Sequence, residues 1–349
     1  MADAVIFMQW DSYQGPAGTP AFFSHEQLTF NSRQERLHQL SEGNRLWLVS
    51  RHPTDQQYYF VAGLHVLNRK RNQPESPEGQ LYGEFAISAD RSQSLDLGTG
   101  FPAEGLLRAF DFVTGRPVKQ GASIGQSLQT LRFLTDEDAE VLSAALKRTM
   151  AGQDAWSDAP CGLWTKCDGV FAEYFLKNWS ERKQPLAFLL YDPPPALQKG
   201  APVFIHSDKA LRLVATFRGA QFVAGYKPTV DEAERVAERE RVWREYREAT
   251  INPPTKSDFN AFWEGQHGVR GFFLMDTVTE FPAPVTFKEY GRALGWGYPM
   301  GVGYRYLTLS QSYLLLRSAK LPGELNRQYL NPLLGQTDRN HAMPDAPPT

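Results

Sequence analysis

The sequence has few cysteines, no long apolar run and no excess of charge of one sign. Its 349 residues contain two cysteines, Cys161 and Cys167 in "CGLWTKC", too few for a disulfide framework and without a paired metal-ligand spacing, so we expect reduced structural thiols. No apolar stretch approaches the roughly 18 residues that span a bilayer, and no basic flank precedes the apolar start. We therefore expect a cytoplasmic protein without a membrane partner.

Signatures of catalysis are missing as well. The histidines are scattered without metal-ligand spacing, and there is no GxSxG nucleophile elbow and no phosphate-binding glycine fingerprint. Glu181 and Lys183, with Asp168 upstream, fall on a predicted helix, whereas a metal-dependent nuclease core holds such groups on adjacent strands. We expect no catalytic residue, no metal and no cofactor. The sequence thus favours a protein without catalytic activity but does not decide the question.

The net charge limits the kind of partner. A formal charge of −2 provides no global basic field, so any contact with nucleic acid has to come from a local patch. A nucleic-acid-binding function therefore depends on particular residues and not on the composition.

The sequence contains an internal repeat. Four pairs of segments occur in the same order in both halves: "IFMQWD" and "AFLLYD", "YFVAGLHV" and "QFVAGYKP", "FPAEGLLRAF" and "FPAPVTFKEYGRAL", and "QTLRFLTDEDAEVL" and "GYRYLTLSQSYLLL". One such match is weak, but four in collinear order predict that one unit is built twice.

Each half has the pattern of several short strands and a final helix. Runs rich in aromatic and β-branched residues predict the strands, and Thr135 with Asp138 marks a helix start. We place a first domain at 1–150, a linker with a helix at 151–184, and a second domain at 185–320 with a helical insertion at 229–250. The polar, Pro-rich residues 335–349 are expected to be disordered.

The order of the motifs resembles a known superfamily. A strand ending in an aromatic and a polar residue is followed by "GNRLWLV", a "VAG" strand, an "FP" segment before a short helix, and R-x-L-T before the last helix. This order resembles the PUA-like superfamily, and within it EVE-type domains, relatives of YTH and ASCH domains. The first half also resembles modules that precede HNH nucleases in restriction-type proteins, although no HNH run is present.

The resemblance implies both a fold and a ligand. The fold is α+β, with two small barrel-like mixed sheets and flanking helices in a tandem pseudo-repeat. The mouth of each barrel accepts one nucleobase, often a modified one that is flipped out of its strand. Such a base needs an aromatic face to stack on and a polar group for its edge.

An aromatic residue followed by an aspartate at a strand end supplies both groups. "GWGYPMGVGYRY" adds aromatic residues in a glycine-rich loop, and "NAFWEG" adds one more. The candidate base-binding residues are Trp10, Asp11, Ser12, Tyr191, Asp192, Trp263, Trp296, Tyr298 and Tyr304. The alternative is that each aromatic is a core residue and each aspartate caps a turn.

Basic residues are the candidates for phosphate contacts. They are the run Arg69, Lys70 and Arg71 after a strand, and the two repeat arginines Arg132 and Arg305. We predict a protein that binds nucleic acid, DNA ahead of RNA, and recognises a modified or flipped base, as the sensor of a bacterial defence or restriction system with a protein partner. The alternatives are an enzyme of unseen activity, either a modification-dependent nuclease or an ASCH-like base hydrolase, and a structural interaction scaffold.

Overall fold

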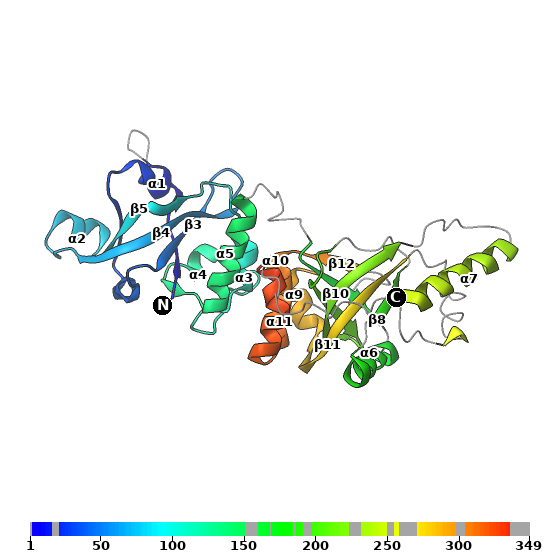
Figure 1. The fold of residues 1–349 in the computed structure, drawn as a ribbon. Coiled ribbons are helices and arrows are strands. Elements are labelled where there is room, and N and C mark those ends of the chain that lie inside the picture. The colour runs from blue at the N-terminus through cyan, green and yellow to red at the C-terminus, as the bar shows by residue number, and fades with distance from the viewer. Residues whose placement is uncertain are drawn as a thin grey trace, which may run out of the picture. The chain divides into compact units, whose positions relative to one another are not determined.

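The protein is described from a computed structural model. The residues that the structure describes are 2–15, 21–150, 160–167, 169–183, 186–190, 197–222, 232–249, 255–257, 271–297 and 304–335. The chain divides into two compact units, 1–157 and 158–349. Each unit is built on its own six-stranded sheet (Figure 1).

The sheet of the first unit is mixed. Its strands are β1 (Ala4–Phe7), β2 (Leu28–Ser32), β3 (Arg45–Arg51), β4 (Tyr58–Arg71), β5 (Phe85–Asp96) and β6 (Arg132–Phe133). They lie in the order β2-β5-β4-β3-β1-β6, with β1 parallel to β3 and the other neighbours antiparallel. The helices are α1 (Trp10–Gln14), α2 (Pro77–Tyr82), α3 (Glu104–Ala109), α4 (Ile124–Ser127) and α5 (Asp136–Met150), with 3-10 turns at Phe22–Ser24 and Glu35–Gln39.

The second unit also has a mixed sheet. Its strands are β7 (Gly162–Lys166), β8 (Leu186–Leu190), β9 (Pro202–Ser207), β10 (Ala210–Phe222), β11 (Gly271–Thr286) and β12 (Tyr304–Leu307). Their order is β12-β7-β9-β10-β11-β8, with β7 parallel to β9 and the other neighbours antiparallel. The helices are α6 (Gly169–Arg182), α7 (Glu232–Ala249), α9 (Phe287–Leu294), α10 (Leu309–Ala319) and α11 (Gly323–Leu333).

The two sheets share one topology. Read from β6 and from β12, they have the same strand order and the same strand directions. One row of paired Cα atoms therefore has a counterpart in the other sheet: Arg132, Val5, Trp47, Gly63 and Leu95 against Arg305, Trp164, Phe204, Val214 and Thr279. The predicted α+β class with two mixed sheets is confirmed.

The later sequence matches agree with this alignment in part. Arg132 and Arg305 occupy the same row, and each is followed by a threonine before a helix, as the fourth match predicts. The third match leads into corresponding helices, α3 and α9. In the second match, Phe60 and Phe222 lie in corresponding strands but at opposite ends of them. The shared "FVAG" letters are therefore not equivalent positions.

The first match is wrong. Strand β1, which leads to Trp10, corresponds to β7 and not to β8, because β1 and β7 are the strands that run parallel to a neighbour. The first residue after the short link is Trp10 in one unit and Gly169 in the other, and each begins a helix. The apolar run that ends near Tyr191 is the edge strand β8.

The segment that we expected to be a linker belongs to the second sheet. Residues 162–182 form β7 and α6, and β7 lies between β12 and β9. Small and turn-forming residues around β7 gave the segment the composition of a linker. Helix α7 lies inside the expected insertion 229–250. The expected disordered tail falls outside the described residues from 336 onward.

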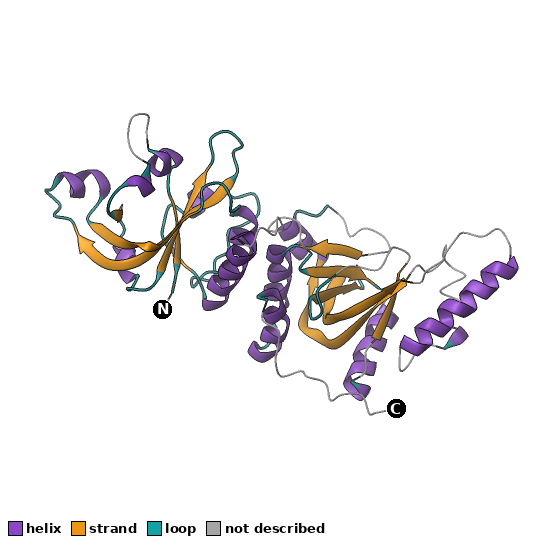
Figure 2. Cartoon of the chain, turned by 45° about the horizontal axis from the view of Figure 1, so that its top comes forward, coloured by secondary structure: helices purple, strands orange, loops and turns teal. Residues whose placement is uncertain are grey.

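Alternate residues of the strands pack on opposite faces, as strand geometry requires. In the second unit, Leu163 and Leu213 form an apolar cluster with Phe175 of α6. The neighbouring Trp164 points to the other face and donates a hydrogen bond to Tyr290 of α9. The second sheet thus carries helices on both faces (Figure 2).

Candidate functional site

The parallel strands β1 and β3 end side by side in the first unit. The chain continues from β1 into α1, where the ring of Trp10 lies edge-on to Tyr13 (centroids 5.5 Å apart) and to His52 (4.7 Å). His52 in turn lies edge-on to Tyr59, at 6.2 Å. Trp10 is half-buried and packs on the apolar core. We name this cluster of Trp10, Tyr13, His52 and Tyr59 the aromatic mouth.

Two carboxylates hold the aromatic mouth in place. Asp55 lies 3.2 Å from Nδ1 of His52 and accepts a hydrogen bond of 2.9 Å from the hydroxyl of Tyr59. The backbone N–H of Gln57 and these side chains lower the pKa of Asp55. The Tyr13 hydroxyl donates to Asp96 at 2.5 Å, and burial together with this carboxylate raises the pKa of Tyr13. Tyr13 therefore remains a donor.

The structure places part of the predicted first site in this cluster. Trp10 belongs to the aromatic mouth, while Asp11 and Ser12 are exposed on the same turn of α1. We expected all three to end a strand. His52, Asp55 and Tyr59 were missed because they lie in and beside the turn after β3, where "HPTD" is an ordinary turn sequence.

The corresponding place in the second unit carries charged groups. In the first sheet, one row of paired Cα atoms ends at Asp96. The corresponding row of the second sheet ends at Glu280. Asp96 accepts from a tyrosine, whereas Glu280 accepts from Arg212 at 3.2 Å. The same carboxylate position therefore serves two different environments.

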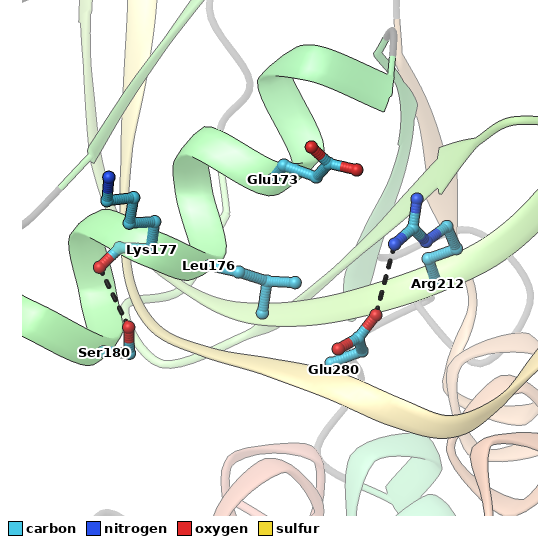
Figure 3. A pocket seen from close by; sticks show the side chains of 6 residues that line it. All are labelled: Glu173, Leu176, Lys177, Ser180, Arg212 and Glu280. Carbon is cyan, nitrogen blue, oxygen red and sulfur yellow. Dashed lines mark hydrogen bonds and ion pairs between the residues drawn. The ribbon is translucent and has the colours of Figure 1, made fainter.

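A pocket of about 500 Å³ lies at this place, between α6 and strands β10 and β11 (Figure 3). It is lined by Glu173, Leu176, Lys177, Ser180, Arg212 and Glu280. Its volume lies in the range of small-molecule sites, roughly 300–1,000 Å³. We name it the charged pocket.

Arg212 is the fixed group of the charged pocket. Its guanidinium contacts Asp208 at 3.0 Å and Glu280 at 3.2 Å. Burial alone would lower the pKa of Arg212, but the hydrogen bonds to these two carboxylates raise it. Glu173 and Lys177 stand one turn apart on α6, and Figure 3 shows Lys177 and Arg212 on opposite sides of the pocket. The pocket thus presents both donors and carboxylate acceptors.

The aromatic residues predicted for the second half do not form one site. Tyr304 packs on the apolar cluster under α6. Trp296 lies on the other face of the sheet, edge-on to Trp164 at 5.6 Å. The remaining candidates, Tyr191, Asp192, Trp263 and Tyr298, lie outside the described residues.

A chain of hydrogen bonds is buried on the α9 face of the second sheet. Trp164 Nε1 donates to the hydroxyl of Tyr290 at 3.2 Å, and that hydroxyl lies 2.7 Å from Nδ1 of His206. Burial, and next the charge of Lys166, lower the pKa of His206 to about 4. His206 is therefore neutral at pH 7, and in the tautomer with Nδ1 unprotonated the Tyr290 hydroxyl donates to it. Apart from a lone histidine, nothing in the sequence indicated these hydrogen bonds.

The predicted basic run does not reach the aromatic mouth. Arg69 donates to the carbonyl of His38 at 2.7 Å, and Arg71 pairs with Glu84. Tyr59 and Arg69 are ten residues apart on β4, which at roughly 3.3 Å per residue is about 30 Å. Arg69, Lys70 and Arg71 are exposed at the far end of this strand. They are a separate surface.

The two repeat arginines have similar surroundings. Arg132 lies over the ring of Phe112, with its guanidinium carbon 4.1 Å from the centroid. Arg305 lies over Trp296 in the same way, at 4.7 Å. A guanidinium stacked on an aromatic ring is thus found on the edge strand of both sheets.

The cysteines, the side chains that could bind a metal and the hydropathy of the helices remain to be described. Cys161 and Cys167 are not joined by a disulfide, and strand β7 separates them. The described residues contain no group of three or more His, Cys, Asp or Glu side chains suited to a metal ion. In the same part of the chain, no helix combines the length and the hydropathy that crossing a membrane requires.

The comparisons with known proteins do not assign this chain to a family. No protein-family model matches the chain, and no curated protein does. Among solved structures, a mutant of ZmASCH from Zymomonas mobilis aligns with 45% of this chain and 97% of its own, at 11% identity and a TM-score of 0.33. A likeness at this level carries no argument about fold or function.

Proposed function

We propose that the protein binds nucleic acid and reads one base, modified or extruded from its strand, at the aromatic mouth. The observation that carries the proposal is the half-buried indole of Trp10, held between His52 and Tyr13 beside the exposed Asp11. Extruding a base costs a few kcal/mol, which stacking on an aromatic ring can recover.

The polar groups around the indole suit the edge of a base. Asp11 and Ser12 are exposed on the turn that carries Trp10, and a carboxylate accepts from the exocyclic amine of cytosine or adenine. The interior of the first sheet is filled by apolar side chains such as Ile6, Leu48 and Leu64. The base therefore stacks at the mouth and does not enter the sheet.

The finer parts of the proposal rest on the sequence resemblance. Two mixed sheets of one topology fit small barrels of the PUA-like type in tandem. The resemblance of the first half to restriction-type modules suggests a sensor of a bacterial defence system, with a protein partner, located in the cytoplasm. For the same reason, we propose DNA in preference to RNA as the nucleic acid that is bound.

Substitution of Trp10 tests the proposal. Trp10→Ala should weaken binding of an oligonucleotide by about 1–3 kcal/mol, about 5- to 150-fold, because the stacking surface is lost. Fluorescence anisotropy with oligonucleotides that carry and lack modified bases measures this effect. Tyr82→Ala is the matched control, since Tyr82 is an aromatic residue of α2 that is 59% exposed and lies away from the mouth.

Asp11→Asn provides the second readout. It replaces a pure acceptor by a group that also donates, so the preferred base should change while the affinity for the backbone remains. The proposal fails if both variants show the circular dichroism of the parent and bind every oligonucleotide as the parent does. Trp10 is then a core residue that happens to reach the surface.

The charged pocket supports a second candidate, a hydrolase acting on a small base-containing substrate. Lys177, Ser180 and Glu173 line one wall of the pocket and Glu280 the other, so groups able to donate and accept protons face a space of nucleoside size. None of the predicted site residues that the structure describes lines this pocket.

Turnover distinguishes this candidate from the first. If the pocket is catalytic, base-modified nucleosides should be converted, and Lys177→Met should slow the reaction at least about 100-fold, as expected for loss of an acid–base group. Chromatography of the products measures the rate, and Lys147→Met, on the exposed face of α5, is the control. Absence of any product with the parent protein removes this candidate.

A further inference from the structure

The guanidinium of Arg132 is fixed by the protein. It stacks on Phe112 at 4.1 Å and donates a hydrogen bond to the backbone carbonyl of Arg116. Arg132 is half-buried, and its strand β6 is held against β1 by the pairing of Arg132 with Val5. Its planar head therefore has one defined orientation before any ligand arrives.

The residue whose carbonyl accepts this hydrogen bond, Arg116, brings a second positive charge on an exposed side chain. Burial lowers the pKa of Arg132, and the charge of Arg116 lowers it further. Among the residues that the structure describes, no carboxylate forms an ion pair with either arginine. The like charges of the two arginines repel each other, and a bound anion offsets that repulsion.

We propose that Arg116 and Arg132 form a phosphate-binding site of the first unit, which takes a phosphate of the nucleic-acid backbone. A guanidinium is planar and binds a phosphate through two parallel hydrogen bonds, which a lysine cannot do. The stacking of Arg132 on Phe112 fixes the plane of the guanidinium, and one of its nitrogens donates to the carbonyl of Arg116. This inference rests on the proposed function for the source of the phosphate, but the anion site can be tested without it.

The place of the site relative to the aromatic mouth is consistent with one bound strand. Arg132 is level with Val5 in the sheet, and Trp10 comes five residues later along the same direction. Five residues span at most roughly 17 Å of chain, and this stretch includes the bend from β1 into α1. A strand with its base at Trp10 therefore meets Arg132 a few nucleotides away, whereas Arg69 is on the order of 30 Å from the mouth.

A titration of the full chain with sodium phosphate at constant ionic strength tests the anion site. The Nε–Hε NMR signal of Arg132, assigned with Arg132→Lys, should shift and saturate. Arg116→Ala should weaken phosphate binding about tenfold, because one charge-assisted contact is lost. Arg91→Ala is the matched control and should bind as the parent, since Arg91 also donates to a backbone carbonyl, that of His25, at 2.7 Å. A linear, unsaturated shift, or equal affinity in Arg116→Ala, overturns the site.

A second experiment, which measures oligonucleotide binding, distinguishes this inference from the proposed function. Arg116→Ala and Arg132→Lys should weaken binding of all sequences alike, and Arg116→Ala should lower the dependence of affinity on salt by about one phosphate contact. If Trp10→Ala weakens binding but the arginine variants do not, the phosphate site is wrong and base reading stands. If phosphate saturates the site but Trp10→Ala has no effect, the site stands and base reading is wrong.

Discussion

His206 lies in the core of the second unit together with two other polar side chains. The hydroxyl of Tyr290 accepts from Trp164 and, with Nδ1 of His206 unprotonated, donates to that nitrogen, so the hydroxyl hydrogen has this acceptor only while the imidazole is neutral. Protonation of Nδ1 would remove the acceptor of the Tyr290 hydroxyl hydrogen and place a charged ring in a buried site. The chain of hydrogen bonds thus depends on the protonation state of one residue.

We predict that the stability of the second unit increases with pH between about 4 and 6.5. The pKa of His206 is about 4 in the folded protein and 6.5 for an ordinary histidine, so the unfolded chain binds the extra proton in this window. Stability from this source is complete above 6.5 and is lost as the pH falls toward 4, by on the order of 3 kcal/mol in total. Urea unfolding at pH 5, 6 and 7 measures the slope.

His206→Asn is the control for this prediction. The asparagine carbonyl can accept from Tyr290 in place of Nδ1 but does not titrate, so the slope should flatten. The carboxylates with lowered pKa values, Asp55, Asp90, Glu240 and Glu289, are present in parent and variant alike, so their contribution to the slope is the same in both. An unchanged slope in the variant would assign the pH dependence to another group.

At the scale of elements, the sequence revealed the local signals that mark where helices begin. Thr308 caps α10 through a capping box with Gln311, and Thr135 accepts from the backbone of Asp138. Such signals depend on residues three apart, so they can be read without knowing the fold. The α+β class follows from the same local patterns.

The correspondence between elements could not be read in this way. The apolar run that forms β8 looks more like β1 than "GLWTK" of β7 does, yet β7 is the counterpart, because it pairs in parallel with β9. Pairing between distant strands decides which segments are equivalent, and local composition does not report it. His52, Asp55 and Tyr59 were missed for the same reason, since the fold alone brings their turn to Trp10.

The whole chain consists of two units that each complete their own sheet. The first apolar core is formed by residues between Ala4 and Leu131, and the second by residues between Leu163 and Val278. Each unit therefore has what a domain needs to fold by itself.

The boundary between the units leads to a prediction about fragments. A fragment 158–349 contains β7 and α6, whereas a fragment 185–349, cut at the boundary that composition suggested, lacks both. Without β7, strand β12 loses its neighbour and β9 loses its parallel partner, and without α6 the side chains of Val203 and Leu213 lose the cover of Phe175. Exposure of two such side chains costs roughly 1.5–3 kcal/mol each, about 3–6 kcal/mol together, which is a large part of the stability of a domain.

We therefore expect fragment 158–349 to unfold cooperatively in urea and fragment 185–349 to be insoluble or to unfold without a transition. Far-UV circular dichroism and urea titration of both fragments measure this difference. Fragment 1–157 serves as the positive control, because it holds all six strands of the first sheet. Equal midpoints for 158–349 and 185–349 would show that β7 and α6 are dispensable, and the shared topology of the two units would then have no part in their stability.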